Sequence, residues 1–159
     1  MFSDLLNKVR TKAEAEFLVS EIELLLESLY EFGDRGFDNV LKTRVRAWAG
    51  ADIEILIKEG GGAKKEFLEK LKKRIDELSI VNLKVAWDPT DDALDKFYSK
   101  LKEFLGDNLL INLEVDPKIV GGAIISYMGI YKDFSVAKLL KDSGPEIEEI
   151  IKDKLHLDF

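Results

Sequence analysis

Cysteine is absent from this 159-residue chain, and histidine occurs only once. The absence of cysteine excludes disulfides, thiolate nucleophiles and zinc sites with thiolate ligands, and it fits a reducing compartment. The single histidine, His156, lies between two leucines, where an ordinary packed side chain is the expected role. No apolar run reaches the roughly 18 residues that a membrane-spanning helix needs. We therefore expect no metal, no other cofactor and no direct insertion into a membrane.

Basic residues are fewer than acidic ones, with 24 Lys and Arg against 31 Asp and Glu, so that the net charge is -7. No basic stripe with interleaved aromatic residues occurs, and we therefore do not expect a nucleic acid as partner. Hydrophobic residues make up 46% of the chain. This content allows one ordinary domain or two small ones.

The N-terminal half has apolar residues at the three- and four-residue steps of helices. Glycine at positions 33 and 36 is expected to end the first helix, and three consecutive glycines at 60–62 are expected to end the second, because glycine loses too much backbone entropy in a helix. The polar interval 10–16 is either a solvated turn of one helix or a break between two. The spacing predicts helices over residues 3–32, 37–58 and 64–78.

The pattern changes after residue 79 to the alternation of half-buried strands. Strands are predicted over residues 80–87, 109–115 and 119–127, and helices over 91–105, 133–141 and 146–154. The predicted fold class is α+β, with a helical bundle of three to four helices followed by a small β-α-β-β-α domain. The domain boundaries are predicted at 1–79 for the helical domain and 80–159 for the α+β domain with its C-terminal helical tail.

Turn chemistry and glycine mark the stretch between the second and third predicted strands. Pro117 fixes its own φ and biases Asp116 toward an extended conformation, which predicts a hairpin between these two strands. Gly121 and Gly122 interrupt a β-branched run, so that another backbone or a bulky ring can approach closely there. Tyr98, Phe104 and Trp87 are the rings considered for this place. Further along the chain, Asp133 and Ser135 can cap the next helix.

These residues carry a resemblance to a known family. The run from Val115 to Gly122, followed by Asp133-Phe134-Ser135-Val136, resembles the C-terminal signature of the delta subunit of F-type ATP synthases, whose mitochondrial relative is the oligomycin-sensitivity-conferring protein. The resemblance covers residues 81–140 and implies a fold signature and docking surface formed by Asp116, Pro117, Gly121, Gly122, Asp133 and Ser135.

The resemblance implies a non-catalytic peripheral-stalk, or stator, subunit of a proton-translocating ATP synthase. In that family the helical domain binds the N-terminal region of the alpha subunits, and the C-terminal domain holds the C-terminal helix of the b subunit. The implied location is the cytoplasmic face of the plasma membrane, reached through the complex. The family's helical domain usually has six helices, more than residues 1–79 hold. Either this part is a reduced bundle with a three-helix core, or its first helix pairs with a partner helix through Phe17, Leu18, Leu25 and Leu29.

Three other interpretations remain open at this point. One is the peripheral-stalk E subunit of a vacuolar or archaeal-type ATPase, although glycines 33, 36 and 60–62 disagree with the long unbroken N-terminal helix of that family. A second is a small-molecule-binding α+β regulatory domain with its ligand at Gly121 and Gly122. The third is a hydrolase that uses carboxylates from the set Asp88, Asp91, Asp92, Asp116 and Asp133.

Overall fold

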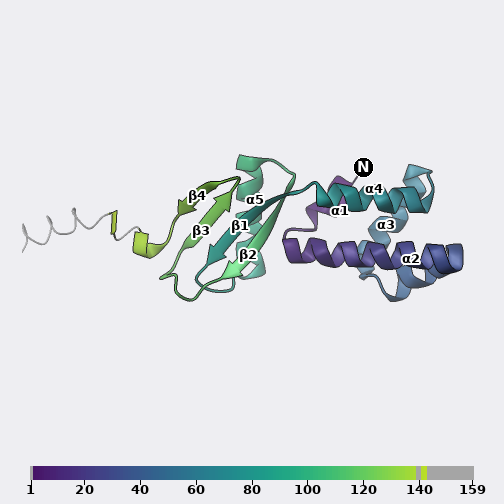
Figure 1. Cartoon of the computed structure of the whole chain (residues 1–159), viewed down its shortest axis with the longest axis horizontal. Helices are drawn as coiled ribbons and strands as arrows, with labels where there is room; N and C mark the ends of the chain where they lie inside the picture. Colours follow the sequence, from purple (N-terminus) through teal and green to yellow (C-terminus); the bar gives the residue numbers. More distant parts are fainter. Residues whose placement is uncertain (1, 139–140, 143–159) are drawn as a thin grey trace, which may run out of the picture. The chain divides into compact units, whose positions relative to one another are not determined.

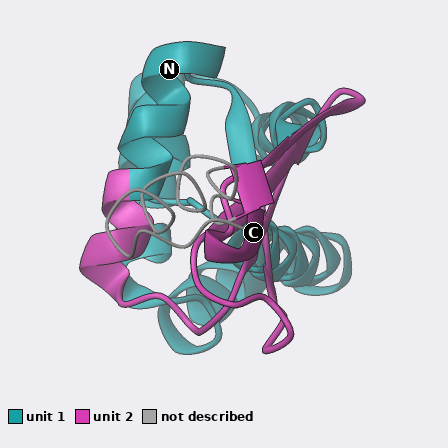
Figure 2. Cartoon of the chain, turned by 90° about the vertical axis from the view of Figure 1, so that its left-hand side faces the viewer, with its two compact units in different colours: residues 1–80, 97–111 teal, residues 81–96, 112–159 magenta. Residues whose placement is uncertain are grey.

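The computed structural model describes residues 2–138 and 141–142 of the chain. The chain forms two compact units, which Figure 2 colours separately. Unit 1 comprises residues 1–80 and 97–111, and unit 2 comprises residues 81–96 and 112–159. Helices precede a small sheet along the chain (Figure 1), which confirms the α+β class. The predicted boundary of independently folding domains at residue 79 stays a prediction.

Unit 1 contains helices α1 (Ser3–Asn7), α2 (Lys12–Thr43), α3 (Ala47–Gly60) and α4 (Lys64–Asp76). A capping box starts α2: the Thr11 side chain accepts a hydrogen bond from the Glu14 backbone N–H at 3.1 Å, and the Glu14 carboxylate accepts one from the Thr11 backbone N–H at 3.1 Å. The polar interval 10–16 therefore contains a break between two helices, located just before Lys12.

The predicted end of a helix at Gly33 is confirmed: Gly33 has a left-handed φ of 64° with a ψ of -151°, so that two helices meet there at a kink, and α2 is the pair of them, from Lys12 to Thr43. The second predicted helix is wrong in its extent. The helix predicted over 37–58 is interrupted between Thr43 and Ala47. There the Arg46 backbone N–H donates to Glu21 Oε1 at 2.7 Å, a contact across 25 residues that leaves no local signal in the sequence. By contrast, the predicted stop at the three glycines is confirmed, because α3 ends at Gly60 and Gly61 has a left-handed φ of 59°.

The core of unit 1 is mainly apolar. Helix α2 packs against α3 and α4, and the amphipathic spacing of each helix supplies the buried stripe. The side chains that are fully buried there include Leu5, Val9, Leu18, Ile22, Leu25, Ile53, Leu68 and Leu71.

The sheet has four strands in the order β2-β1-β3-β4. Its elements are β1 (Ser79–Val85), α5 (Asp91–Leu105), β2 (Leu109–Val115), β3 (Ala123–Tyr127) and β4 (Ile130–Asp133). The bonds at the two ends of β1, from Ser79 N–H to the Asn108 carbonyl and from Asp116 N–H to the Val85 carbonyl, show that β1 and β2 run parallel. The other two pairs, β1 with β3 and β3 with β4, are antiparallel.

The predicted hairpin between the second and third strands is wrong, because β1 lies between β2 and β3. Strand β3 begins at Ala123 rather than at residue 119, since Gly121 and Gly122 have φ values of 72° and 81° and lie in the preceding loop. The hairpin of this sheet instead joins β3 to β4. Its turn consists of Met128 (φ 47°) and Gly129 (φ 80°), both left-handed, as a two-residue hairpin turn requires.

The ends of the described chain show two further features. Residues 136–138 are helical, in agreement with the predicted helix start at Asp133-Phe134-Ser135. The segment before α2 pairs with β2, because the Ile111 N–H donates to the Arg10 carbonyl at 2.8 Å and Thr11 forms a parallel bridge with Ile111. The predicted terminal helix 146–154 and His156 lie outside the described residues.

Candidate functional site

The residues of the family signature gather at one end of the sheet, within unit 2. Strands β1 and β2 are parallel, so both end there, at Val85 and Val115. Strand β3 begins at the same end, because Ala123 is paired with Val85, and β4 finishes there, because Asp133 is paired with Ile124. The order of the strands therefore brings together segments that are distant in the sequence, such as those at Val85 and Asp133.

Asp116 organises the loop that leaves β2. Its backbone N–H donates to the Val85 carbonyl at 2.8 Å, and its carboxylate accepts a hydrogen bond from the Lys118 N–H at 3.0 Å across Pro117. Its carbonyl accepts from the Ile119 N–H at 3.1 Å, which closes the turn. Asp116 and Pro117 thus redirect the chain over the end of β1 toward the start of β3.

Gly122 allows two backbone segments to touch. A Cβ atom at this position would collide with the Phe134 carbonyl oxygen and would lie 2.9 Å from the Ser135 Cα. At Gly121, a Cβ atom would lie 3.0 Å from Val136 Cγ2. Backbone bonds join the same segments, from Phe134 N–H to the Ala123 carbonyl at 2.8 Å and from Val136 N–H to the Gly121 carbonyl at 3.2 Å. The two glycines therefore hold the two halves of the signature together.

Of the two neighbours expected beside the glycines, the backbone is confirmed and the aromatic ring is wrong. Phe104 and Trp87 are 81% and 64% exposed, and Tyr98 is buried within unit 1, where its hydroxyl lies 3.4 Å from the Val9 carbonyl oxygen. The close neighbour of Gly122 is main chain, which also occupies the place that a ligand at the glycine pair would need.

Asp133 and Ser135 start the last described helical turn. The Asp133 carboxylate accepts a hydrogen bond from the Ser135 N–H at 2.8 Å, and Ser135 Oγ accepts one from the Lys138 N–H at 3.2 Å. Ser135 is thus the helix cap, while Asp133 positions Ser135. Hydrogen bonds from the Ser135 side chain and then from its backbone N–H lower the pKa of Asp133. The carboxylate is therefore held in its charged form.

Several exposed apolar side chains belong to the segments at this end of the sheet, and we call them the apolar end of the sheet. Each is at least 40% exposed, and each ends β2, follows β1 or β4, or precedes β3: Trp87, Val115, Val120, Phe134 and Val136. The glycine contacts place Val136 against the loop that carries Val120. Exposed apolar side chains gathered in this way are typical of a protein-protein contact. The sequence pattern alone could not distinguish these residues from core residues.

The four residues considered for a partner-helix face differ in their exposure to solvent. Leu18 and Leu25 are fully buried in the core of unit 1, and Leu29 packs against that core. This agrees with the alternative in which they form the core of the helical part. Phe17 is 53% exposed, with its ring 4.5 Å from the Arg46 guanidinium carbon. A partner role for this face stays a prediction, and it now rests on Phe17, the exposed member of the four.

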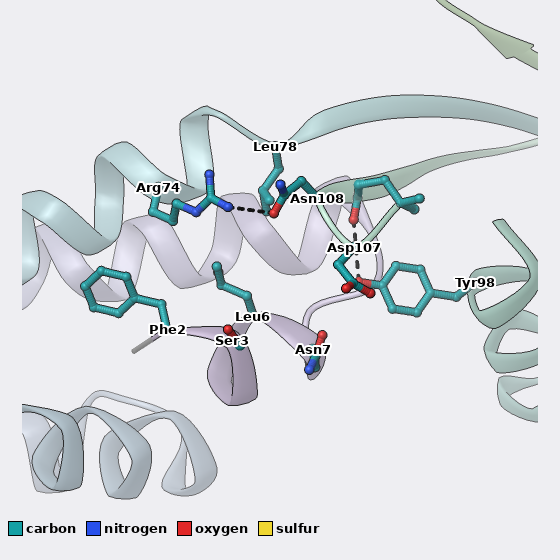
Figure 3. A pocket seen from close by; sticks show the side chains of 10 residues that line it. Phe2, Ser3, Leu6, Asn7, Arg74, Leu78, Tyr98, Asp107 and Asn108 are labelled. Carbon is teal, nitrogen blue, oxygen red and sulfur yellow. Dashed lines mark hydrogen bonds between the residues drawn. The ribbon is translucent and has the colours of Figure 1, made fainter. Parts of the chain in front are cut away.

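A polar pocket of about 280 Å³ lies in unit 1 between α1, α4 and the start of β2 (Figure 3). Several of its polar groups are paired: Arg74 Nη2 donates to Asn108 Oδ1 at 2.6 Å, and the ammonium of the neighbouring Lys102 lies 2.7 Å from Asn7 Oδ1 and 3.2 Å from the Asp107 carboxylate. Burial raises the pKa of Tyr98, whose hydroxyl also faces this pocket. These polar groups of the pocket are therefore already paired within the protein.

Within residues 2–138 and 141–142, no group of three or more His, Asp or Glu side chains is placed to hold a metal ion. Within the same residues, no helix combines the length and the apolar character that crossing a bilayer requires.

Comparison with known proteins identifies the family. A family model described as "ATP synthase delta (OSCP) subunit" matches residues 63–144, which is more than half of the chain. The match spans α4, the sheet with α5, and the signature residues described above. The chain belongs to the ATP synthase delta (OSCP) subunit family, and it is a peripheral-stalk subunit of an F-type ATP synthase.

Among solved structures, a chain of the cryo-EM structure of the Polytomella F-ATP synthase is similar, with 18% sequence identity and a TM-score of 0.42. The similarity covers 48% of this chain and 99% of that chain. A comparison with curated proteins finds no match.

Proposed function

We propose that this stalk subunit connects the catalytic head of the ATP synthase to the b-subunit stalk without performing catalysis itself. In this proposal unit 2 binds the C-terminal helix of the b subunit through the apolar end of the sheet. The helical part before residue 63 binds the N-terminal region of the alpha subunits. The subunit then lies at the cytoplasmic face of the membrane, held there by its partners. Such a role needs two docking surfaces rather than an active site.

The observation that carries this proposal is the apolar end of the sheet. The residues that resemble the family signature contact one another: main chain lies against the glycine pair, and the turn at Asp116 and the cap at Ser135 are closed by their own hydrogen bonds. Large apolar side chains face the solvent beside these contacts: Phe134 is 62% exposed and Val120 is 65% exposed. A rigid backbone junction that presents apolar groups supports docking of an amphipathic helix.

The test is binding of a fluorescent peptide from the C-terminal end of the b subunit of the same ATP synthase, measured by anisotropy. We expect the full chain to bind it saturably, and the double variant Val120→Asn/Phe134→Asn to bind at least tenfold more weakly. Both side chains point away from the core, so the fold should survive, which circular dichroism checks. Loss of a central apolar anchor commonly costs about 2 kcal/mol or more of binding free energy.

Met128→Asn is the matched control. Met128 is 82% exposed, lies at the opposite end of β3, and has the left-handed φ that asparagine tolerates. We expect this variant to bind the b-subunit peptide as the parent chain does. Equal weakening by Met128→Asn and by the double variant, or no binding by the parent chain, would contradict the proposal.

A further inference from the structure

Strand β4 is an outer strand of the sheet, at the edge opposite to β2 (Figure 1). It is joined to β3 by a two-residue turn, so that Tyr127 and Ile130 form the first hydrogen-bonded pair of the hairpin. Bonded and non-bonded pairs alternate along an antiparallel ladder. The backbone N–H and C=O groups of Ile130 and Lys132 therefore face β3, whereas those of Tyr131 and Asp133 face outward.

The outward backbone groups of β4 are unoccupied. Within the described part of the chain, no backbone hydrogen bond outside the sheet involves Tyr131 or Asp133. The ladder continues to Phe134, whose N–H donates to the Ala123 carbonyl and so faces β3 as the alternation requires. At the other edge of the sheet, by contrast, the Ile111 N–H of β2 is paired with the segment before α2. Strand β4 thus offers free donors and acceptors to an added strand.

Apolar side chains are exposed on both faces of β4. Ile130 is 62% exposed and Tyr131 is 61% exposed. Successive residues of a strand point to opposite faces of the sheet, so each face carries one of these two side chains. A helix lying on the sheet could cover only one of them. A strand added at the edge would place cross-strand neighbours beside both, which indicates an extended segment as the occupant.

Lys132 limits which strands can pair with this edge. It is exposed in the middle of β4, and it forms no ion pair within the described residues, whereas Lys84 on β1 is bound to Glu114 at 2.9 Å. A lysine on an edge strand hinders the addition of a strand that presents an apolar or basic residue there. A strand with Asp or Glu opposite Lys132 pairs with it favourably.

A second copy of this chain does not meet this requirement. When two β4 strands pair antiparallel, the alignment that uses both Tyr131 and Asp133 of each copy places the two Lys132 side chains directly opposite each other. Like charges in this position are destabilising. The net charge of -7 adds repulsion between two copies. The occupant that fits is therefore a strand of another protein.

We propose that the outer edge of β4 binds an extended segment of another protein, which joins the sheet as an additional antiparallel strand. The segment presents Asp or Glu opposite Lys132, with an apolar residue on either side of this acid in its sequence. The antiparallel direction is chosen because it gives the more stable pairing per residue. The proposal does not depend on the b-subunit contact, in which a helix binds the apolar end of the sheet.

The probe is the nine-residue peptide Thr-Val-Thr-Val-Glu-Val-Thr-Val-Thr, labelled with a fluorophore and titrated against the full chain by anisotropy. We expect saturable binding, and binding at least tenfold weaker when Lys replaces the Glu. Two N-methylated forms of the probe test the backbone bonds. In the proposed pairing, the N–H groups of the two Val residues beside the Glu face β4, whereas the Glu N–H faces away. Methylation of these two Val nitrogens should abolish binding, and methylation of the Glu nitrogen should leave it nearly unchanged.

The charge at position 132 should control the preference. In Lys132→Glu, the probe with Lys in place of Glu should become the tighter ligand. Lys96→Glu is the matched control, because it makes the same change of charge at an exposed position of α5. This control should keep the preference for the Glu probe. Both variants should bind the b-subunit peptide as the parent chain does, which separates this test from that of the proposed function.

Hydrogen exchange of single amides, followed by NMR, can locate the added strand. In the free chain, the amides of Ile130 and Lys132 should exchange slowly because they are bound to β3, and those of Tyr131 and Asp133 should exchange fast. The Glu probe should slow Tyr131 and Asp133 at least tenfold and leave Ile130 and Lys132 unchanged.

Several results would overturn the proposal. One is failure of the Glu probe to bind, and another is equal binding by the two methylated forms. Equal shifts of preference in Lys132→Glu and Lys96→Glu would reduce the effect to general electrostatics. Slow exchange of the Tyr131 and Asp133 amides in the free chain at every concentration would mean that the chain covers this edge itself. Exchange that slows as the protein concentration rises would make a second copy the occupant.

Discussion

The two units expose their apolar residues in different ways. Unit 1 contains nearly all the large side chains that are fully buried, and one side of α2 is closed into its core. Among the described residues of unit 2, Val81 and Leu83 are fully buried, and several exposed apolar residues lie near the signature at the end of the sheet. Unit 1 is thus held by side-chain packing and by a buried ion pair, whereas the signature junction of unit 2 is held by main-chain contact. This difference predicts which substitutions each unit tolerates.

The largest effect is expected in unit 1, at the turn before α3. Glu21 is only 2% exposed, and Arg46 binds it through its backbone N–H, Nε and Nη2 at 2.7 to 3.1 Å. Arg46→Ala leaves this buried carboxylate without its cation, which should cost about 3–5 kcal/mol of unfolding free energy, measured by urea denaturation. Lys72→Ala removes the exposed pair with Glu23 and should cost less than about 1 kcal/mol. Equal losses in the two variants would show that burial of Glu21 adds nothing.

The next effect tests the main-chain junction of unit 2. Gly122→Ala introduces a methyl group against the Phe134 carbonyl at a left-handed φ of 81°. Backbone strain and overpacking together should therefore lower the free energy of unfolding by about 3 kcal/mol. Gly129→Ala has a similar φ of 80° with nothing within 4 Å, and should cost only about 1 kcal/mol.

Hydrogen exchange can localise the Gly122→Ala effect. We expect faster exchange of the β3 amides in this variant and unchanged exchange in the middle of α2. Similar losses for the two glycine variants would mean that the collision with Phe134 is relieved easily.

The smallest effect is expected in the pH dependence of stability. Each unit has a carboxylate near the start of a helix, Glu14 in unit 1 and Asp133 in unit 2, whose pKa is lowered. Burial alone would raise the pKa of Glu14, but hydrogen bonds from the Arg10 and Thr11 backbone N–H groups and from the Arg10 side chain lower it overall. The pKa of Asp133 is also lowered. Each charged carboxylate therefore stabilises its unit above the ordinary pKa of about 4, and the stabilisation is lost as the pH falls through the lower folded value.

Urea midpoints of Glu14→Gln and Asp133→Asn can check this sign. Both variants should be less stable than the parent chain at pH 7, and the differences should shrink as the pH falls below about 4. The difference for Glu14→Gln should be the larger, because more donors serve that carboxylate. A difference that grows on acidification would refute the assignment.

Local chemistry in the sequence predicts much of this fold. The bounds of α5 and β2 and the glycine stop after α3 agree with the prediction, because capping residues, alternation and backbone entropy act over a few neighbours. The hairpin prediction is wrong for a related reason: Asp116 and Pro117 do specify a turn, but the partner of β3 is β1, about forty residues earlier. Turn chemistry specifies where a chain bends and leaves open which strand it then pairs with.

The candidate surfaces show the same limit. The role of Gly122 as a place of close approach could be inferred from glycine in a β-branched run, but the approaching Phe134 main chain could not. The exposure of Phe134 depends on that long-range contact. Leu18 and Phe17 are neighbours of similar hydrophobicity, and only the packing of α2 makes one of them core and the other surface.

The pairing of Arg10 and Thr11 with β2 has a consequence for how copies of this chain behave together. Strand β2 is an outer strand of the sheet, and its Ile111 amide is satisfied by the segment just before α2. Unpaired outer strands recruit strands from other molecules and start aggregation. Arg10 and Thr11 therefore cover this part of the outer edge of β2 and keep a strand of another molecule from pairing there. Loss of this pairing would expose the Ile111 amide to other strands, even though every residue of the family signature would remain.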